Sequence, residues 1–98
     1  MARVTVEAFV WDDRNLDEIA RHGLRFWEVD EVLLGPYRVD PNRPGRRASH
    51  LLIGRTENGE CVAVPIEPTA DRAIWRPVTA WRCKRSEWAR LAQMRHWR

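Results

Sequence analysis

The feature of this sequence that most constrains its fold is a hairpin signal in the middle of the chain. Two runs typical of strands, SHLLIGRT at residues 49–56 and ECVAVPIE at residues 60–67, flank the tripeptide ENG. Asn58-Gly59 favours a tight turn, because glycine adopts a positive φ without steric penalty. Pro65 has no backbone donor, so the second strand is expected to lie at an edge or to carry a bulge near that residue. The chain is therefore predicted to contain an antiparallel sheet.

Helical periodicity in three other stretches predicts helices beside this sheet. The stretches are residues 12–23, 26–34 and 84–94. Asp12 or Asp13 is suited to cap the first helix, and Gly23 supplies the left-handed residue that ends it. Two helices are thus expected before the hairpin and one after it.

Extended patterns complete the predicted order of elements. They cover residues 4–11, 37–40 and 74–82, while residues 41–48 form a polar loop rich in proline and glycine that is expected to be flexible. The resulting order, β-α-α-β-β-β-β-α, predicts an α+β fold with a small antiparallel β-sheet, two N-terminal helices and one C-terminal helix. Because 98 residues suffice for one modest core, residues 1–98 are expected to form a single domain.

The sequence carries no signature of a membrane, secreted or cofactor-dependent protein. No apolar run approaches the roughly 18 residues that cross a bilayer, and the first residues do not resemble a leader peptide, so we expect a cytoplasmic protein. In that compartment Cys61 and Cys83 are expected to be two small, half-buried side chains and not a disulfide. Dinucleotide-binding, P-loop, zinc-protease and serine-hydrolase motifs are absent and the three histidines are scattered, so neither a cofactor nor a metal site is predicted.

The cationic residues are unevenly distributed. Residues 1–40 carry nine acidic and five basic residues, whereas residues 41–98 carry five acidic and twelve basic residues, and sixteen of the seventeen cations are arginine. Arginine pairs with phosphate through a planar fork and stacks on bases. The asymmetry predicts a basic face built from the second half of the chain. The alternative is that a small basic domain keeps its arginines outside because the core does not accept them.

The second half also holds the residues best suited to contact phosphate. In an unbulged strand over residues 74–82, Arg76 and Arg82 would share one face. Together with Arg55, at the end of the first hairpin strand, they would form a phosphate-binding surface. His50 is a candidate proton acceptor for RNA cleavage, although it is equally suited to be an ordinary exposed strand residue.

The six tryptophans divide into two groups. Core positions are expected for Trp11, Trp27, Trp75 and Trp88. The roles of Trp81 and Trp97 are not decided by the sequence, because an exposed tryptophan either stacks on a base or anchors a protein partner. In an unbulged strand Trp75 and Trp81 would share the face opposite the two arginines.

Beyond these patterns, the chain resembles a known family. The stretch FVWDDRNLDEIARHGLRFWEVDEVLLGP is similar to the opening of BrnT-type toxins, the ribonuclease halves of bacterial type II toxin–antitoxin pairs. The matching pairs and the hairpin motif are Trp11-Asp12, His22-Gly23, Val32-Leu33 and Ile53-Gly54-Arg55-Thr56. The segment RPVTAWRCKRSEW at residues 76–88 is similar to the family's RIISARxATxxER segment. Trp81 stands where the family has an arginine and Pro77 where it has an aliphatic residue; a one-residue bulge at Pro77 would let Arg82 compensate.

The resemblance implies a RelE-like fold, a metal-independent endoribonuclease acting on RNA, and a cognate antitoxin of the ribbon-helix-helix type. Under this hypothesis Arg55, Arg76 and Arg82 hold the scissile phosphate, and His50 or Glu87 accepts the proton. Further nucleic-acid contacts are expected from Arg46, Arg47, Lys84, Arg85 and Trp81. The competing interpretations are a non-catalytic nucleic-acid- or protein-binding module on the same fold, with Trp81 as an anchor, and a purely structural partner protein.

Overall fold

The predicted hairpin forms the centre of the sheet in the computed structural model, which describes residues 4–93. Its strands are β3 (His50–Arg55) and β4 (Cys61–Pro68), paired antiparallel along the whole of β3. Gly59 closes the turn with a φ of 84°. The expectation that the second strand is an edge or bulged near Pro65 was wrong: β4 pairs with β3 on one side and with β5 and β6 on the other, and the bulge lies in the neighbouring chain segment at residues 78–80.

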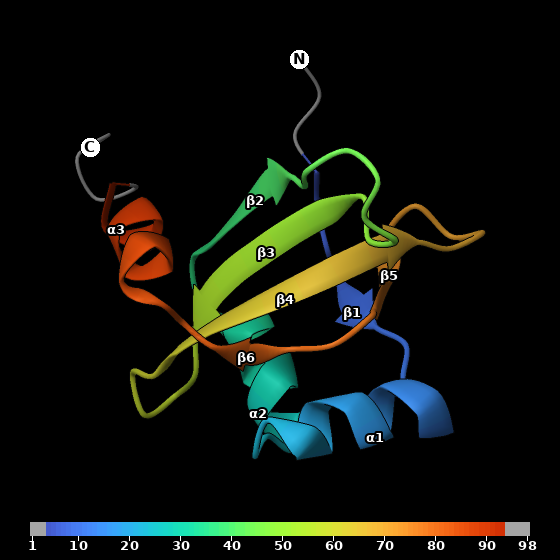
Figure 1. Ribbon diagram of the computed structural model, residues 1–98, viewed down its shortest axis with the longest axis horizontal. Coiled ribbons are helices and arrows are strands. Elements are labelled where there is room, and N and C mark those ends of the chain that lie inside the picture. The colour runs from blue at the N-terminus through green and yellow to red at the C-terminus, as the bar shows by residue number, and fades with distance from the viewer. Residues whose placement is uncertain (1–3, 94–98) are drawn as a thin grey trace.

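The remaining strands extend this hairpin into a mostly antiparallel sheet of six strands within the described residues (Figure 1). β2 (Tyr37–Pro41) lies at one edge, and β1 (Ala8–Phe9) lies at the other, parallel to β5 (Ile74–Pro77). The prediction of a single strand over residues 74–82 was wrong. It is divided into β5 and the two-residue β6 (Trp81–Arg82), and both pair with β4. The α+β class is confirmed.

Three α-helices in the described part of the chain cover the two faces of this sheet unequally. The helix α1 (Asp13–Arg21) is capped by Asp12 and ends at Gly23, which has a φ of 75°. The helix α2 (Phe26–Asp30) continues into the 3-10 turn η1 (Glu31–Leu34). These elements lie together below the sheet in Figure 1, whereas α3 (Arg85–Gln93) lies apart from them at the other end of the molecule.

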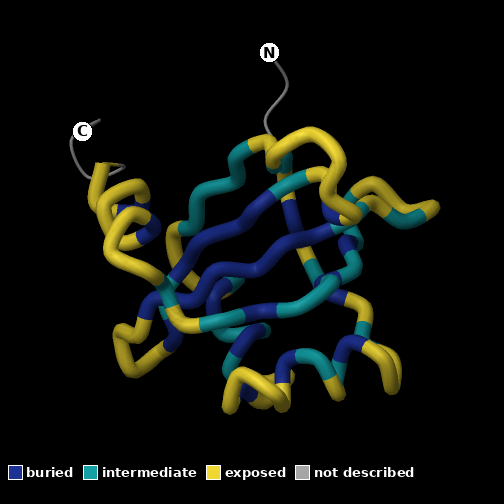
Figure 2. The backbone as a smooth tube through the Cα atoms, in the orientation of Figure 1, coloured by how far each residue is buried: buried dark blue, intermediate teal, exposed yellow. Residues whose placement is uncertain are grey.

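The two faces of the sheet carry separate apolar clusters because side chains of β4 alternate between them. Val62, Val64 and Ile66 pack with residues of α1, α2 and η1 in the larger cluster. Cys61 and Ala63 pack with Leu91 of α3 in the smaller cluster. Figure 2 shows β3 and β4 buried, with α3 and the loop between β2 and β3 largely exposed. The face that carries α3 is therefore the more open one.

Gly54 permits the close approach of η1 to β3. A Cβ atom at this position would lie 2.9 Å from Cβ of Val32 and 3.3 Å from its carbonyl oxygen. Since Val32 is fully buried, it has no free space into which to move. Glycine at the centre of the IGR motif thus has a packing role.

Cys61 and Cys83 form a disulfide, so the expectation of two separate thiols was wrong. β6 pairs with β4 through Val62↔Arg82, and the next position along places Cys83 opposite Cys61. Their Cα atoms are 5.3 Å apart, and the Cys83 N–H donates to the Cys61 carbonyl at 3.0 Å. The pairing depends on strand register, which a separation of 22 residues in the sequence does not reveal.

The tryptophans follow the expectation only in part. Trp75 is buried and Trp11 is half-buried, but Trp27 and Trp88 expose 51% and 39% of their surface. The core position predicted for Trp27 was therefore wrong, and Trp88 lies at the surface of α3. Trp97 lies outside the described residues. Within residues 4–93, no helix is long and apolar enough to cross a membrane.

Candidate nucleic-acid interface

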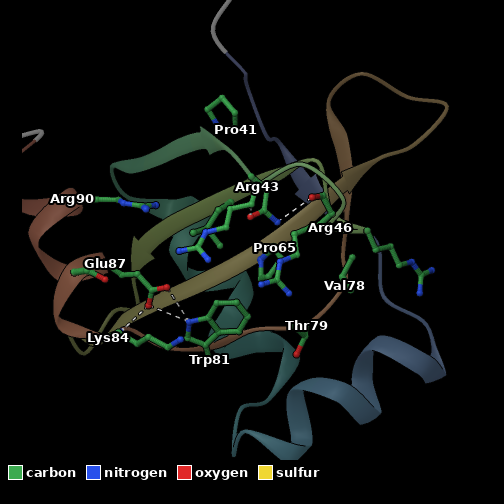
Figure 3. A pocket seen from close by; sticks show the side chains of 15 residues that line it. Pro41, Arg43, Arg46, Pro65, Val78, Thr79, Trp81, Lys84, Glu87 and Arg90 are labelled. Carbon is green, nitrogen blue, oxygen red and sulfur yellow. Dashed lines mark hydrogen bonds between the residues drawn. The ribbon is translucent and has the colours of Figure 1, made fainter.

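A groove of about 540 Å³ opens on the face of the sheet that carries α3 (Figure 3). One wall is the end of β2 and the loop that follows it, at residues 41–48, and the other is formed by residues 78–84 and by α3 as far as Arg90. Its cationic lining residues are Arg43, Arg46, Arg47, Lys84 and Arg90. Among the described residues of this lining, Glu87 is the one acidic side chain. The groove is thus strongly basic.

The loop wall contributes three arginines to the lining of the groove, Arg43, Arg46 and Arg47. Asn42 closes the base of the loop: its Nδ2 donates to the Ala48 carbonyl at 3.0 Å, and its backbone N–H donates to Ser49 at 2.9 Å. Residues 43–47 are all exposed. No carboxylate among residues 4–93 forms an ion pair with Arg43 or Arg46, and their guanidinium groups remain available to a ligand.

The opposite wall is a small hydrogen-bonded cluster at the start of α3. Oε1 of Glu87 accepts from the Lys84 backbone N–H at 2.7 Å, which caps the helix. The Trp81 Nε1–H donates to the same carboxylate at 3.1 and 3.2 Å. Nζ of Lys84 lies 5.8 Å from the centre of the Trp81 ring. Figure 3 shows Trp81 and Glu87 side by side in this wall.

The floor of the groove is apolar. Leu51 of β3 and Pro65 of β4 line it between the two cationic walls. An apolar floor between cationic rims suits a ligand that combines an anionic backbone with flat aromatic groups, as single-stranded nucleic acid does.

A one-residue bulge decides which side chains reach this groove. Ile66 pairs with Pro77, and Ala63 pairs with Trp81, so two residues of β4 face the three residues at positions 78–80. The extra residue reverses the faces of all following side chains. Trp81 therefore shares the groove face with Arg76.

Arg82 consequently points to the opposite face, and the expectation that Arg76 and Arg82 share a face was wrong. The matching expectation for Trp75 and Trp81 fails for the same reason, since Trp75 packs in the larger cluster and Trp81 in the smaller one. BrnT-type sequences have an arginine at the position of Trp81. The bulge turns Arg82 away from the groove, so Arg82 does not replace that arginine.

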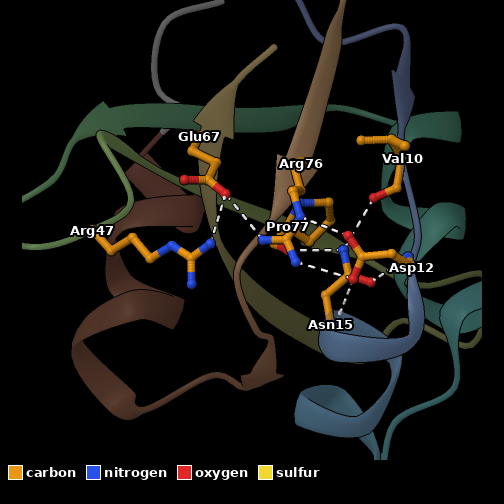
Figure 4. A network of polar contacts seen from close by, with 7 residues as sticks. All are labelled: Val10, Asp12, Asn15, Arg47, Glu67, Arg76 and Pro77. Carbon is orange, nitrogen blue, oxygen red and sulfur yellow. Dashed lines mark hydrogen bonds and ion pairs between the residues drawn. The ribbon is translucent and has the colours of Figure 1, made fainter.

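Arg76 is held by two carboxylates outside the groove (Figure 4). Its Nε and Nη2 donate to the two oxygens of Asp12 at 2.8 and 3.0 Å, and its Nη1 donates to Glu67 at 3.0 Å. Hydrogen bonds from Arg76 lower the pKa of Asp12 from 3.8 to about 2, and Asp12 in turn raises the pKa of Arg76. Arg47 lies 3.6 Å from Glu67 and connects this network to the groove.

Asn15, which sequence reasoning did not single out, organises the same network. It is fully buried, and its Oδ1 accepts from the Asp12 backbone N–H at 2.7 Å. Its Nδ2 donates to the carbonyls of Val10 and Pro77, both at 3.0 Å. The side chain thereby joins α1 to β5 and to the residue that follows β1. Its place three residues after the capping aspartate is the signal that could have found it.

The other predicted catalytic residues lie apart from the groove. Arg82 donates to Glu60 at 2.9 Å and to the carbonyls that end α1. The guanidinium carbon of Arg55 lies 5.2 Å from the centre of the Trp88 ring. His50 pairs with Ile66 on the face opposite the groove, and its ring packs edge-to-face on Trp75 at 5.1 Å.

The structure thus brings together one group of the predicted residues and disperses the other. The groove lining includes Arg46, Arg47, Trp81, Lys84 and Glu87 and does not include Arg55, Arg76, Arg82, His50 or Arg85. Two cationic residues of the groove were missed. Arg43 belongs to the same PNRPGRR loop as Arg46, and Arg90 lies three residues after Glu87 on α3, so helical spacing could have found it.

Comparisons with known proteins add no family to this geometry: no protein-family model, curated protein or solved structure matches the chain. Among the described residues, no group of three or more His, Cys, Asp or Glu side chains is placed to hold a metal ion. The groove is therefore the candidate functional site of the described residues.

Proposed function

We propose that the groove binds single-stranded RNA. The observation that carries this proposal is the presence of five cations around an apolar floor, three of which, Arg43, Arg46 and Lys84, have no carboxylate partner among the described residues. Cations that are not already paired contact phosphate without first breaking an ion pair. Each contact also releases counterions from the RNA, which favours binding at low salt.

The resemblance to BrnT-type toxins supports a wider form of the same proposal. In this form the protein is a cytoplasmic, toxin-like partner of an antitoxin of the ribbon-helix-helix type. A stable complex with the product of an adjacent ribbon-helix-helix gene, seen by co-expression and gel filtration, is the expected result. Lack of a complex would restrict the proposal to RNA binding.

A second candidate function is metal-independent RNA cleavage in the groove. Glu87 favours it, because this carboxylate lines the groove among the cations that would stabilise a developing phosphorane charge. One of its oxygens, Oε2, has a single hydrogen-bond partner, the Trp81 indole at 3.2 Å, and is the better placed to accept a proton. This form of the reaction does not use Arg76, Arg82 or His50.

The test measures binding and cleavage of end-labelled single-stranded RNA in EDTA. Arg43→Ala/Arg46→Ala is compared with Arg14→Ala/Arg72→Ala, which removes the same charge at exposed positions outside the groove. If each arginine–phosphate contact is worth about 1 kcal/mol, the groove variant loses affinity about 30-fold. Equal losses in both variants would show non-specific attraction and overturn the assignment. Cleavage that is lost in Glu87→Gln would support the second candidate.

A further inference from the structure

The Cys61–Cys83 disulfide fastens the α3 wall of the groove to the sheet. Cys61 begins β4, and Cys83 lies between β6 and Lys84, the residue that precedes α3. Trp81 and Lys84, on either side of Cys83, both line the groove. The cross-link therefore lies within two residues of the groove-lining side chains.

Most other contacts between this wall and the sheet lie at the surface. β6 has only two residues, and the buried residues of α3 are Glu87 and Leu91. Glu87 bonds to Trp81 and to the start of α3, which belong to the wall itself. At the surface, Arg38 donates to the Arg90 carbonyl and to Gln93. Arg90 also lies 3.8 Å from Asp40, and the guanidinium group of Arg55 lies over the Trp88 ring. Segments with few buried contacts open locally at a low free-energy cost.

Of the two cysteines, Cys83 is the more accessible to a reductant. Cys83 is half-buried, whereas Cys61 is only 3% exposed. The thiolate of a dithiol reductant would attack Sγ of Cys83, forming a mixed disulfide and releasing the Cys61 thiolate, which takes up a proton. The second thiol of the reductant then displaces Cys83 as a thiol and leaves the reductant as a disulfide. Lys84, which follows Cys83 and lines the groove, favours the approach of the anionic thiolate.

We propose that this disulfide is a redox-controlled lock: the oxidised protein holds the groove wall in place, and reduction by a dithiol loosens the wall and weakens RNA binding. The inference rests on the proposed function for its effect on RNA. It also agrees with the expected cytoplasmic location, because the few disulfides of cytosolic proteins are usually transient and redox-sensing.

Two measurements on the full chain test the lock. RNA affinity is measured for the oxidised protein and after treatment with dithiothreitol, with Cys61→Ala/Cys83→Ala as a variant that dithiothreitol cannot alter. If the reduced wall is in place about a tenth of the time, the affinity falls about tenfold. Amide hydrogen exchange is followed in parallel. Faster exchange on reduction is expected in residues 81–90 and not in β3.

The outcomes separate the lock from the proposed function. Unchanged exchange in residues 81–90 on reduction would overturn the lock, whatever the RNA affinity. Faster exchange in β3 as well would also overturn it, because it would indicate global unfolding. Local loosening in a protein that never binds RNA would support the redox-sensitive wall and overturn the proposed function. If the alanine variant does not fold, the oxidised and reduced wild-type samples still decide the question.

Discussion

Two basic regions of this molecule use the same guanidinium group in opposite ways. Around Arg76, side chains of Asp12 and Glu67 accept hydrogen bonds from all three guanidinium nitrogens. In the groove, Arg43 and Arg46 form no ion pair with a described residue. The first region uses arginine to join α1 to β4 and β5, and the second leaves arginine available for a ligand. Local pairing therefore separates the two roles, whereas the number of cations does not.

The largest effect is expected from removing the buried side chain that organises the paired region. Asn15→Ala leaves the Val10 and Pro77 carbonyls and the Asp12 backbone N–H without this partner. At about 1 kcal/mol for each lost bond, the free energy of unfolding falls by about 3 kcal/mol. Urea denaturation measures the loss, with exposed Arg14→Ala on the same helix as control. A loss under about 1 kcal/mol would show that the network does not depend on this residue.

A smaller loss of stability is expected for Arg76→Ala. The substitution removes hydrogen bonds to two charged carboxylates, but Asp12 exposes 46% of its side chain and is readily solvated. We therefore expect about 1–2 kcal/mol of destabilisation. RNA affinity is expected to stay within about twofold, since Arg76 does not line the groove. A variant with wild-type stability and no RNA binding would break the comparison between the two regions.

Acid should weaken the paired region through Asp12. Its pKa is about 2 in the folded protein and 3.8 ordinarily, so the unfolded chain binds more protons between these values. The contribution of Asp12 to the free energy of unfolding is thus fully present above about pH 4 and is lost as the pH falls toward 2. The melting temperatures of wild type and Asp12→Asn should converge over this range. A constant difference down to pH 2 would contradict the lowered pKa.

The smallest effect is expected in the salt dependence of RNA binding. Arg46→Ala should reduce the slope of log affinity against log salt by about 0.7, the contribution of one contact to single-stranded nucleic acid. Arg72→Ala, which changes an exposed arginine outside the groove, should leave the slope unchanged. Binding isotherms at several salt concentrations measure both slopes, and equal slopes would remove Arg46 from the interface.

Local sequence signals predicted the parts of this fold that depend on local chemistry. The Asn58-Gly59 turn, the Asp12 cap and the Gly23 helix end follow from the residues at those positions, and all three are present. Most of the loop and helix residues that line the groove could also be predicted as nucleic-acid contacts, because they are basic or aromatic. That these residues lie on the same face of the molecule depends on how the strands pair, which the local sequence does not show.

What could not be predicted depends on contacts between distant strands. The register of β6 against β4 is set by the bulge at residues 78–80, and no local pattern determines it. That register decides the disulfide and the separation of Arg76 from Arg82. The pairing of Arg76 with Asp12 joins residues that are 64 positions apart, so a phosphate-binding role was the natural expectation from sequence.

The bulge makes the lining of the groove a matter of strand register as well as residue type. If the same chain paired without the bulge, in the register of β5, Arg82 would lie opposite Cys61 on the groove face and Trp81 would point away from the groove. Cys83 would then lie opposite Glu60 and not opposite Cys61. A slip of one residue would thus exchange an aromatic, covalently fastened wall for a cationic, unfastened one, with every amino acid retained. The Cys61–Cys83 cross-link, which forms in one register and not in the other, therefore also determines which side chains line the groove.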